Sequence, residues 1–345
     1  MLALLVVVSH MEQQFSPAWL HEILGPLHLG MLAVLLFFVV SGYVIYEACD
    51  IFYSRRPSGF LLNRFFRIYP PFVFALLISL FVHFVCYRFN TYGPVFQSPS
   101  DVLGYVSFKS IFLNLTSLID DRVPNSKENY YLFVRYVWAI VVEVQFYLVV
   151  AAFLYIKGKL PHQKQPGFVW ILLATAMLYG AHISLKVQYF KFLDYAPYFL
   201  LGISIYRLSK QNKESRFEFL EFMASLALSI HAFYIQVFSS ESFSWFGVVI
   251  IGGLFSTFVF LAAYKRTSGG GNLKKMDNKL GDLTYPLYLN HYTIEVAVFA
   301  FIGSKSMETM MVAIISSILL AWVATISVEP LTRRVRDKIR GSRIS

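Results

Sequence analysis

Long apolar runs separated by short polar stretches make up most of the chain. A helix that crosses about 30 Å of lipid hydrocarbon, with a rise of about 1.5 Å per residue, needs roughly 20 apolar residues. Ten runs are candidates for such helices, although the first is too short to cross alone: 1–10, 29–48, 69–87, 132–156, 168–186, 193–208, 217–237, 244–264, 284–303 and 308–328. The pattern predicts an all-α fold, a polytopic membrane helix bundle of about ten transmembrane helices.

The short first run has two interpretations. Residues 1–8 are apolar, and the polar residues His10, Glu12, Gln13 and Gln14 follow, so the run is either part of a helix or the core of a signal peptide. A signal peptide needs a basic start and a cleavage site of small residues, and the sequence shows neither. We therefore expect a first transmembrane helix that is truncated at its start.

The composition excludes several classes of protein. Of the 345 residues, 57% are hydrophobic and only 14% are charged, and the mean hydropathy is +0.57, whereas a globular domain carries about 25% charged residues. A soluble globular fold and a disordered chain are therefore excluded. The net charge of +10 would suit nucleic acid only on a soluble scaffold with a basic face, so we expect no nucleic-acid partner. Cys49 and Cys86 fall at opposite ends of the membrane and cannot form a disulfide.

The positive charges indicate how the chain lies in the membrane. If the N-terminus is inside, 22 of the 30 Lys and Arg residues fall on the inner side of a ten-helix path. Because Lys and Arg concentrate on the cytoplasmic side, both termini are predicted to lie in the cytoplasm, with the protein in the inner (plasma) membrane and membrane lipids as partners. We divide the chain into a membrane domain at 1–332 and a basic cytoplasmic tail at 333–345. The outer segment 101–118 is expected to be amphipathic and to lie at the interface.

Four polar residues interrupt the apolar runs: His10, Ser41, Glu143 and His291. A charged or strongly polar side chain within the hydrocarbon costs about 2.5–3.5 kcal/mol on insertion scales, so such residues indicate functional sites by default.

The depths of these residues place them in one layer. Counted from the helix ends, Glu143 lies roughly 16 Å below the outer surface and His291 roughly 12 Å above the inner one. His10 joins this layer if the first helix starts at an inner segment, and a histidine near a buried carboxylate can act as a general base. Tyr285, Tyr288 and His291 recur at intervals of three and so share a helix face.

Each residue also has a structural interpretation, which the sequence leaves open. Glu143 is consistent with holding two helices together, and Ser41 beside Gly42 with a close-packing position. His10 is consistent with an interfacial helix end, and His291 with an aromatic belt. Their joint occurrence favours a site.

A second feature lies on the inner side, where Arg64 and Arg67 precede Pro70 and Pro71. The two arginines share a face if a helix begins there. Guanidinium groups bind phosphate bidentately, although the pair also fits anchors of the positive-inside kind.

Five segments form an ordered set of motifs: LLVVVSH at 4–10, LFFVVSGYVI at 36–45, NRFFRIYPPF at 63–72, VWAIVVEVQFYL at 137–148 and LGDLTYPLYLNH at 280–291. Together they resemble the acyltransferase-3 family over nearly the whole chain. The resemblance implies an integral membrane acyltransferase, typically of ten helices, that acylates cell-surface polysaccharides, O-antigen, peptidoglycan, lipo-oligosaccharide signals or small molecules.

The resemblance also implies roles for single residues. It makes His10 the catalytic residue and places Arg64 and Arg67 on the acyl-CoA side; Ser41, Gly42 and Glu143 also match the family pattern. The family has a further Arg eleven residues before the His, which here would fall before Met1.

These observations predict a membrane O-acyltransferase. It would move an acyl group, expected to be acetyl, from acyl-CoA to a hydroxyl of a cell-surface or exported glycan, with no metal. His10, assisted by Glu143, would take the acceptor's proton or first receive the acyl group, and Ser41, Tyr288 or His291 would contact the oxyanion or the substrate.

Two other functions are open to a helical membrane protein. The main alternative is a polytopic transporter or flippase for a glycan or small molecule, in which buried His and Glu relay protons. A structural or sensory membrane protein explains neither the arginine pair nor the midplane carboxylate.

Overall fold

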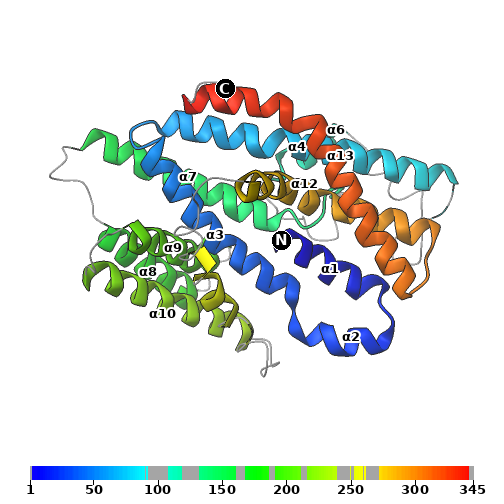
Figure 1. Ribbon diagram of the computed structural model, residues 1–345, viewed down its shortest axis with the longest axis horizontal. Helices are drawn as coiled ribbons and strands as arrows, with labels where there is room; N and C mark the ends of the chain where they lie inside the picture. The colour runs from blue at the N-terminus through cyan, green and yellow to red at the C-terminus, as the bar shows by residue number, and fades with distance from the viewer. Residues whose placement is uncertain are drawn as a thin grey trace. The chain divides into compact units, whose positions relative to one another are not determined.

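The computed structural model describes residues 2–89, 91, 108–118, 132–160, 168–185, 191–210, 216–238, 249, 252–258, 260–261 and 272–341. These residues form helices and connecting turns, and no strand occurs among them (Figure 1). The predicted all-α fold class is confirmed.

The helices coincide with most of the predicted apolar runs. Within the described ranges lie α1 (Leu2–Phe15), α2 (Ala18–Leu24), α3 (Leu29–Ile51), α4 (Pro57–Phe89), α6 (Phe108–Thr116), α7 (Trp138–Lys159), α8 (Phe168–Leu185), α9 (Lys191–Lys210), α10 (Arg216–Phe238), α12 (Asn272–Phe301) and α13 (Met307–Arg340), together with the 3-10 turn η1 (Gly25–Leu27). The run at 244–264 falls largely outside the described residues.

Among the described residues, five helical stretches are long and apolar enough to cross a membrane: Ala18–Ile51, Pro57–Phe89, Trp138–Lys159, Arg216–Gln236 and Met307–Arg340. The shorter apolar helix Ile171–Leu185 adds to them. The multi-helix membrane character is thus supported, whereas the number of about ten transmembrane helices stays a prediction. Helix α12 does not qualify by composition because Asn290, His291 and Glu295 interrupt its apolar part.

Several helix boundaries differ from those expected. Helix α4 begins at Pro57, not near 69, because proline suits the first position of a helix, and Pro70 and Pro71 lie inside it. Helix α7 begins at Trp138, not near 132. Helix α13 continues through most of the expected tail to Arg340 and ends at Gly341, whose φ of 81° is the left-handed conformation that glycine adopts readily.

The chain forms two compact units. One comprises Met1–Gly30, Asn63–Val144 and Lys275–Ser345, and the other comprises Met31–Leu62 and Gln145–Lys274.

In the first unit, α1 packs against α12 and α13. Ala3, Val7, Met11 and Phe15 recur every four residues and form one apolar stripe. The stripe contributes to a buried cluster that also contains Leu287, Val298 and Phe299 from α12 and Met310, Ala313 and Ala321 from α13. Figure 1 shows α1 beside α13, in agreement with the contacts between them.

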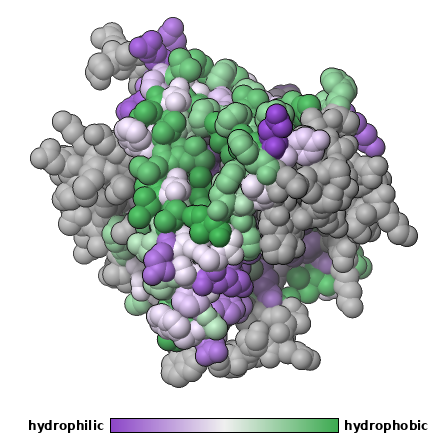
Figure 2. All heavy atoms as spheres, turned by 90° about the vertical axis from the view of Figure 1, so that its right-hand side faces the viewer, coloured by the Kyte–Doolittle hydropathy of each residue, from purple (hydrophilic) through white to green (hydrophobic). Residues whose placement is uncertain are grey.

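The outer side of the first unit is apolar, as lipid contact requires. Exposed large apolar side chains follow α4 and α13, among them Leu77, Phe81, Phe84, Ile315, Leu319 and Trp322. Figure 2 shows one face on which hydrophobic residues form a continuous area, with hydrophilic residues gathered mainly toward its ends. Such a band between polar ends is the surface expected of a membrane-embedded unit.

Helix α6 covers part of the segment that was expected to be amphipathic. Its Phe108 and Phe112 are exposed, while Ser110 and Asn114 are buried. The amphipathic character is confirmed over Phe108–Thr116, and a position at the membrane interface stays a prediction. Residues 101–107 lie outside the described part of the chain.

In the second unit, α9 packs closely against α3 and α10. A Cβ atom at Gly42 would overlap the backbone carbonyl of Phe199, and one at Gly202 would overlap that of Val39. Only residues without a side chain permit this approach of two backbones.

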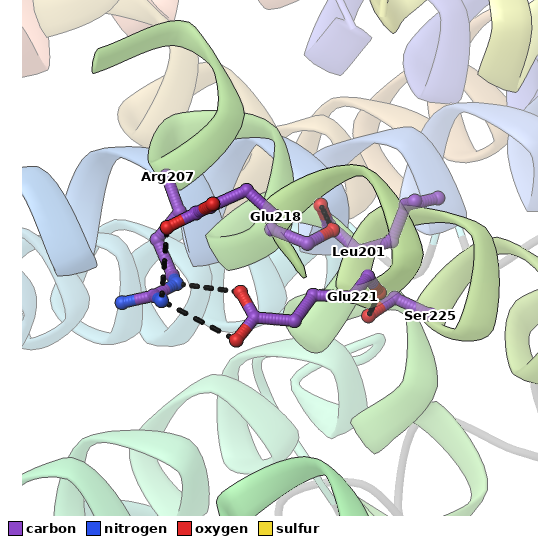
Figure 3. A network of polar contacts seen from close by, with 6 residues as sticks. Leu201, Arg207, Glu218, Glu221 and Ser225 are labelled. Carbon is purple, nitrogen blue, oxygen red and sulfur yellow. Dashed lines mark hydrogen bonds and ion pairs between the residues drawn. The ribbon is translucent and has the colours of Figure 1, made fainter. Parts of the chain in front are cut away.

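Toward the end of α9, Arg207 forms a bidentate ion pair with Glu221 at 2.9 and 3.3 Å, with Glu218 3.9 Å away (Figure 3).

Candidate active site

The packing of α1 places His10. The residue lies three positions after Val7 and seven after Ala3, so it continues the edge of the buried stripe of α1. It is half-buried. The apolar contacts of α1 with α12 and α13 therefore decide where the imidazole lies.

The His10 ring lies beside two other rings, which come from distant parts of the sequence. The Tyr136 ring centroid lies 4.1 Å from that of His10, and the His291 centroid lies 5.1 Å from it with the two planes inclined by 30°. Tyr136 and His291 stack at 5.3 Å and 16°. The structure thus brings together the two histidines that the depth argument assigned to one layer, and it adds Tyr136.

The segment 133–137, which carries Tyr136, is mostly buried but not helical. Buried backbone groups outside regular structure need other partners. At Phe133, the N–H donates to Asn114 Oδ1 of α6 at 2.9 Å, and the carbonyl accepts from Ser79 Oγ of α4. Two neighbouring helices thus hold this segment through polar side chains.

Tyr136 itself has an unusual backbone conformation, with φ of 58°. The left-handed region is rare for a bulky residue and costs about 1–3 kcal/mol. Tyr288 on α12 donates a hydrogen bond from its hydroxyl to the Tyr136 carbonyl at 2.5 Å. This bond and the two histidine rings hold Tyr136 in the strained conformation, which is a feature common at functional sites.

His291 is 0% exposed, and its Nδ1 lies 2.6 Å from the Tyr288 backbone carbonyl. Because a carbonyl oxygen only accepts, Nδ1 carries the hydrogen and donates. In the neutral ring Nε2 then has the free lone pair. His291 is therefore arranged to accept a proton at Nε2, and it can donate one to an oxyanion only after it has been protonated.

Glu143 is connected to the same group. It is buried on α7, with 7% of its surface exposed, and its charge acts on Tyr288, the residue that bonds to Tyr136. Because α7 begins at Trp138, Glu143 lies five residues into the helix, about 7.5 Å, and not the roughly 16 Å expected from the earlier start.

Ser41 belongs to the second unit, where it is buried with 7% of its surface exposed. The close approach of Gly42 to Phe199 supports the packing interpretation for this Ser-Gly pair. Contact of Ser41 with an oxyanion or substrate stays a prediction.

A basic group forms where the part of α4 that follows Asn63 lies beside the end of α13 (Figure 1). Asn63 Nδ2 donates to the Arg336 carbonyl at 3.1 Å, and Arg336 pairs bidentately with Glu329 at 2.9 and 3.3 Å. The charges of Arg67 and Arg333 also act on Glu329.

The two predicted arginines of α4 differ in burial. Arg64 is 5% exposed, whereas Arg67 is exposed. Arg67, Arg333 and Arg336 outnumber the carboxylates of Glu329 and Asp282, so the group favours an anion.

Sequence reasoning missed two residues of the first unit. Tyr136 lies in a short connection and carries no signal of its own, because only the folded chain places it between two histidines. Glu295 lies on α12, four residues after His291, and is 5% exposed. The criterion that identified Glu143, an ionisable residue in an apolar run, applies equally to Glu295.

Comparison with known proteins identifies the family. A family model described as an acyltransferase domain, Acyl_transf_3, matches residues 1–327. No curated protein and no solved structure matches the chain. The family match covers nearly the entire sequence. It includes His10, Tyr136, Tyr288 and His291, which we call the His10 group, and the α4 arginines. The chain therefore belongs to the acyltransferase-3 family, whose members are membrane acyltransferases.

Proposed function

We propose that this membrane acyltransferase moves an acyl group, expected to be acetyl, from acyl-CoA to a hydroxyl of a cell-surface or exported glycan. The observation that carries the proposal is the contact of His10 with Tyr136 and His291 inside an acyltransferase domain. Imidazole has the basicity that proton transfer from a hydroxyl requires near neutral pH.

His10 can carry the proton that the reaction moves from the acceptor hydroxyl to the leaving group. The acceptor oxygen attacks the thioester carbonyl carbon, the C–S bond breaks, and the hydroxyl proton passes through His10 to the leaving thiolate. Alternatively, an imidazole nitrogen of His10 attacks the thioester carbonyl carbon, the C–S bond breaks and the leaving thiolate takes the imidazole N–H proton. The acceptor oxygen then attacks the acyl-imidazole, its C–N bond breaks, and the hydroxyl proton returns to the imidazole. In both routes Glu143 acts on the group through Tyr288, and it favours the positive charge that develops on imidazole.

The group that stabilises the oxyanion has three candidates: Ser41, Tyr288 and His291. The Tyr288 hydroxyl donates to the Tyr136 carbonyl, and the neutral His291 presents a lone pair at Nε2. Both would have to change hydrogen-bond partner or protonation state to stabilise negative charge. Ser41, which is buried in the second unit, stays the third proposed donor.

The donor is proposed to bind at the basic group on α4 and α13. Coenzyme A carries phosphates, and Arg67 lies in a group whose arginines outnumber its carboxylates, while Arg64 precedes it by three residues on α4. This assignment goes with a cytoplasmic position for that end of both helices, in the plasma membrane with both termini inside, because acyl-CoA is a cytoplasmic metabolite and Lys and Arg concentrate on that side.

The proposal is tested by comparing surface glycans from wild-type cells and cells that lack the gene. We expect NMR to show an ester that is lost in the deletion strain and restored by the wild-type gene, but not by a His10→Ala variant that remains in the membrane. The family match does not favour the transporter alternative. If the glycan failed to reach the surface at all in the deletion strain, the acyltransferase proposal would be wrong and the transporter would be favoured.

A further inference from the structure

Helix α12 concentrates buried polar atoms without hydrogen-bond partners. Four such atoms lie within six residues: Asn290 Oδ1, His291 Nε2, Thr293 Oγ1 and Glu295 Oε2. None of these residues is more than 5% exposed. Because buried polar groups in proteins almost always have partners, their concentration on one helix indicates a polar ligand beside it.

Two of these atoms share one face. His291 and Glu295 are four residues apart, so their side chains lie one above the other, separated by one helical turn of about 5.4 Å. Tyr136 packs against this face, because its ring stacks on His291 and meets Tyr292 edge-on at 5.8 Å. Arg135 places a positive charge close enough to act on the Glu295 carboxylate. Glu295 is therefore part of the wall that holds the His10 group.

The chemistry of the two atoms defines the ligand. With Nδ1 donating to the Tyr288 carbonyl, Nε2 of neutral His291 accepts hydrogen bonds. An ionised carboxylate oxygen also only accepts. A ligand that satisfies both must present two donors about one helical turn apart, which a polyhydroxylated molecule does and a single alcohol does not.

We propose that Glu295 accepts a hydrogen bond from one hydroxyl of the acceptor and so determines which acceptors are used, while His291 Nε2 accepts from another, and the hydroxyl that reacts at His10 is a third. The inference rests on the proposed function and specifies its acceptor as a polyol. Glu295 selects the acceptor by binding it, and His10 remains the residue that carries the acyl-transfer step.

The test uses the full chain reconstituted in lipid nanodiscs, with acetyl-CoA as the donor. The acceptor is unacylated glycan from cells that lack the gene. Glu295→Gln keeps the size of the side chain but replaces a charged acceptor by a weaker neutral one. We expect the acceptor KM to rise about tenfold, with the KM for acetyl-CoA unchanged and kcat reduced by less than twofold.

Two further variants make the result specific. Glu308→Gln removes a carboxylate from the exposed start of α13 and should leave both KM values unchanged. Glu295→Asp keeps the charge on a shorter side chain, so its acceptor KM should fall between those of wild type and Glu295→Gln. It also provides a folded variant if Glu295→Gln fails to insert.

Three results would overturn the inference. An unchanged acceptor KM with a lowered melting temperature would make Glu295 a structural residue, and a rise in the KM for acetyl-CoA alone would assign this face to the donor. In both cases the wild-type protein still acylates the glycan, so the proposed function stands. If the wild-type protein transferred no acetyl group from acetyl-CoA, the proposed function would fail, and this inference would fail with it.

Discussion

The ring centroids of His10 and His291 lie 5.1 Å apart, and the planes of the two rings are inclined by only 30°. Two imidazolium ions at this distance would repel each other strongly in a buried environment, so at most one ring is charged at a time. The pair can thus hold one transferred proton, which is what a base that acts on a hydroxyl requires. This relationship, together with Tyr136, leads to the first two predictions.

Replacing His10 with alanine should lower the rate of acylation by about 10²- to 10⁴-fold, the range that a positioned general base contributes. Acetyl transfer from radiolabelled acetyl-CoA to the glycan in membrane vesicles measures it. His231→Ala is the matched control, because His231 is an exposed histidine of the second unit. Equal losses in both variants, or normal transfer by His10→Ala, would contradict the assignment.

Two substitutions at Tyr136 separate the contribution of its ring from that of its backbone conformation. Tyr136→Phe keeps the stacking and should retain most activity. Tyr136→Gly relieves a backbone conformation that costs about 1–3 kcal/mol but removes the ring. We expect this variant to keep its melting temperature within a few degrees and to lose at least tenfold in kcat. Parallel loss of melting temperature and activity would indicate that the ring serves only in folding.

Removing the Tyr288 hydroxyl should weaken the segment 133–137. In Tyr288→Phe the Tyr136 carbonyl loses its donor, and an unsatisfied buried carbonyl costs about 1–3 kcal/mol. We expect a lower melting temperature in detergent and faster hydrogen exchange in this segment by mass spectrometry. Tyr285→Phe removes a comparable bond, from the Tyr285 hydroxyl to the Ile68 carbonyl at 3.1 Å, and should leave exchange in 133–137 unchanged.

The α4 arginines should matter only for a donor that carries phosphates. Arg67→Gln is expected to raise the KM for acetyl-CoA about tenfold, because it removes a charged hydrogen-bond donor, and to leave the KM for acetyl-pantetheine unchanged. Arg334→Gln, at an exposed position of α13, is the control. An equal effect of Arg67→Gln on both donors would assign this residue to folding or insertion and not to phosphate binding.

The glycine beside Ser41 should tolerate no side chain. Gly42→Ala places a methyl group against the Phe199 carbonyl and should destabilise the protein by at least about 1–3 kcal/mol. Gly158→Ala and Gly180→Ala meet nothing within 4 Å, so they should be neutral or stabilise their helices by up to about 1 kcal/mol. Melting temperatures in one detergent measure all three, and tolerance of Gly42→Ala would contradict the close-packing interpretation.

The sequence by itself determined the helical architecture and most of the candidate site. The length of an apolar run needed to cross hydrocarbon is a property of the chain alone, so the helices at α3, α7 and α13 followed from the pattern. The cost of polar groups in such runs likewise identified His10, Glu143 and His291 without coordinates. The same rule applies to Glu295, an ionisable residue in the apolar run of α12, so the sequence also contains the signal for this residue.

The tertiary structure alone decided which groups act on one another. Tyr136 meets His10 and His291 because α4, α6 and α12 hold the segment 133–137 in a buried, non-helical path, and no local preference encodes a tyrosine in the left-handed conformation. The contacts of Tyr136 with His10 and His291 join segments more than 100 residues apart, whereas hydropathy reports only what each segment does alone in lipid.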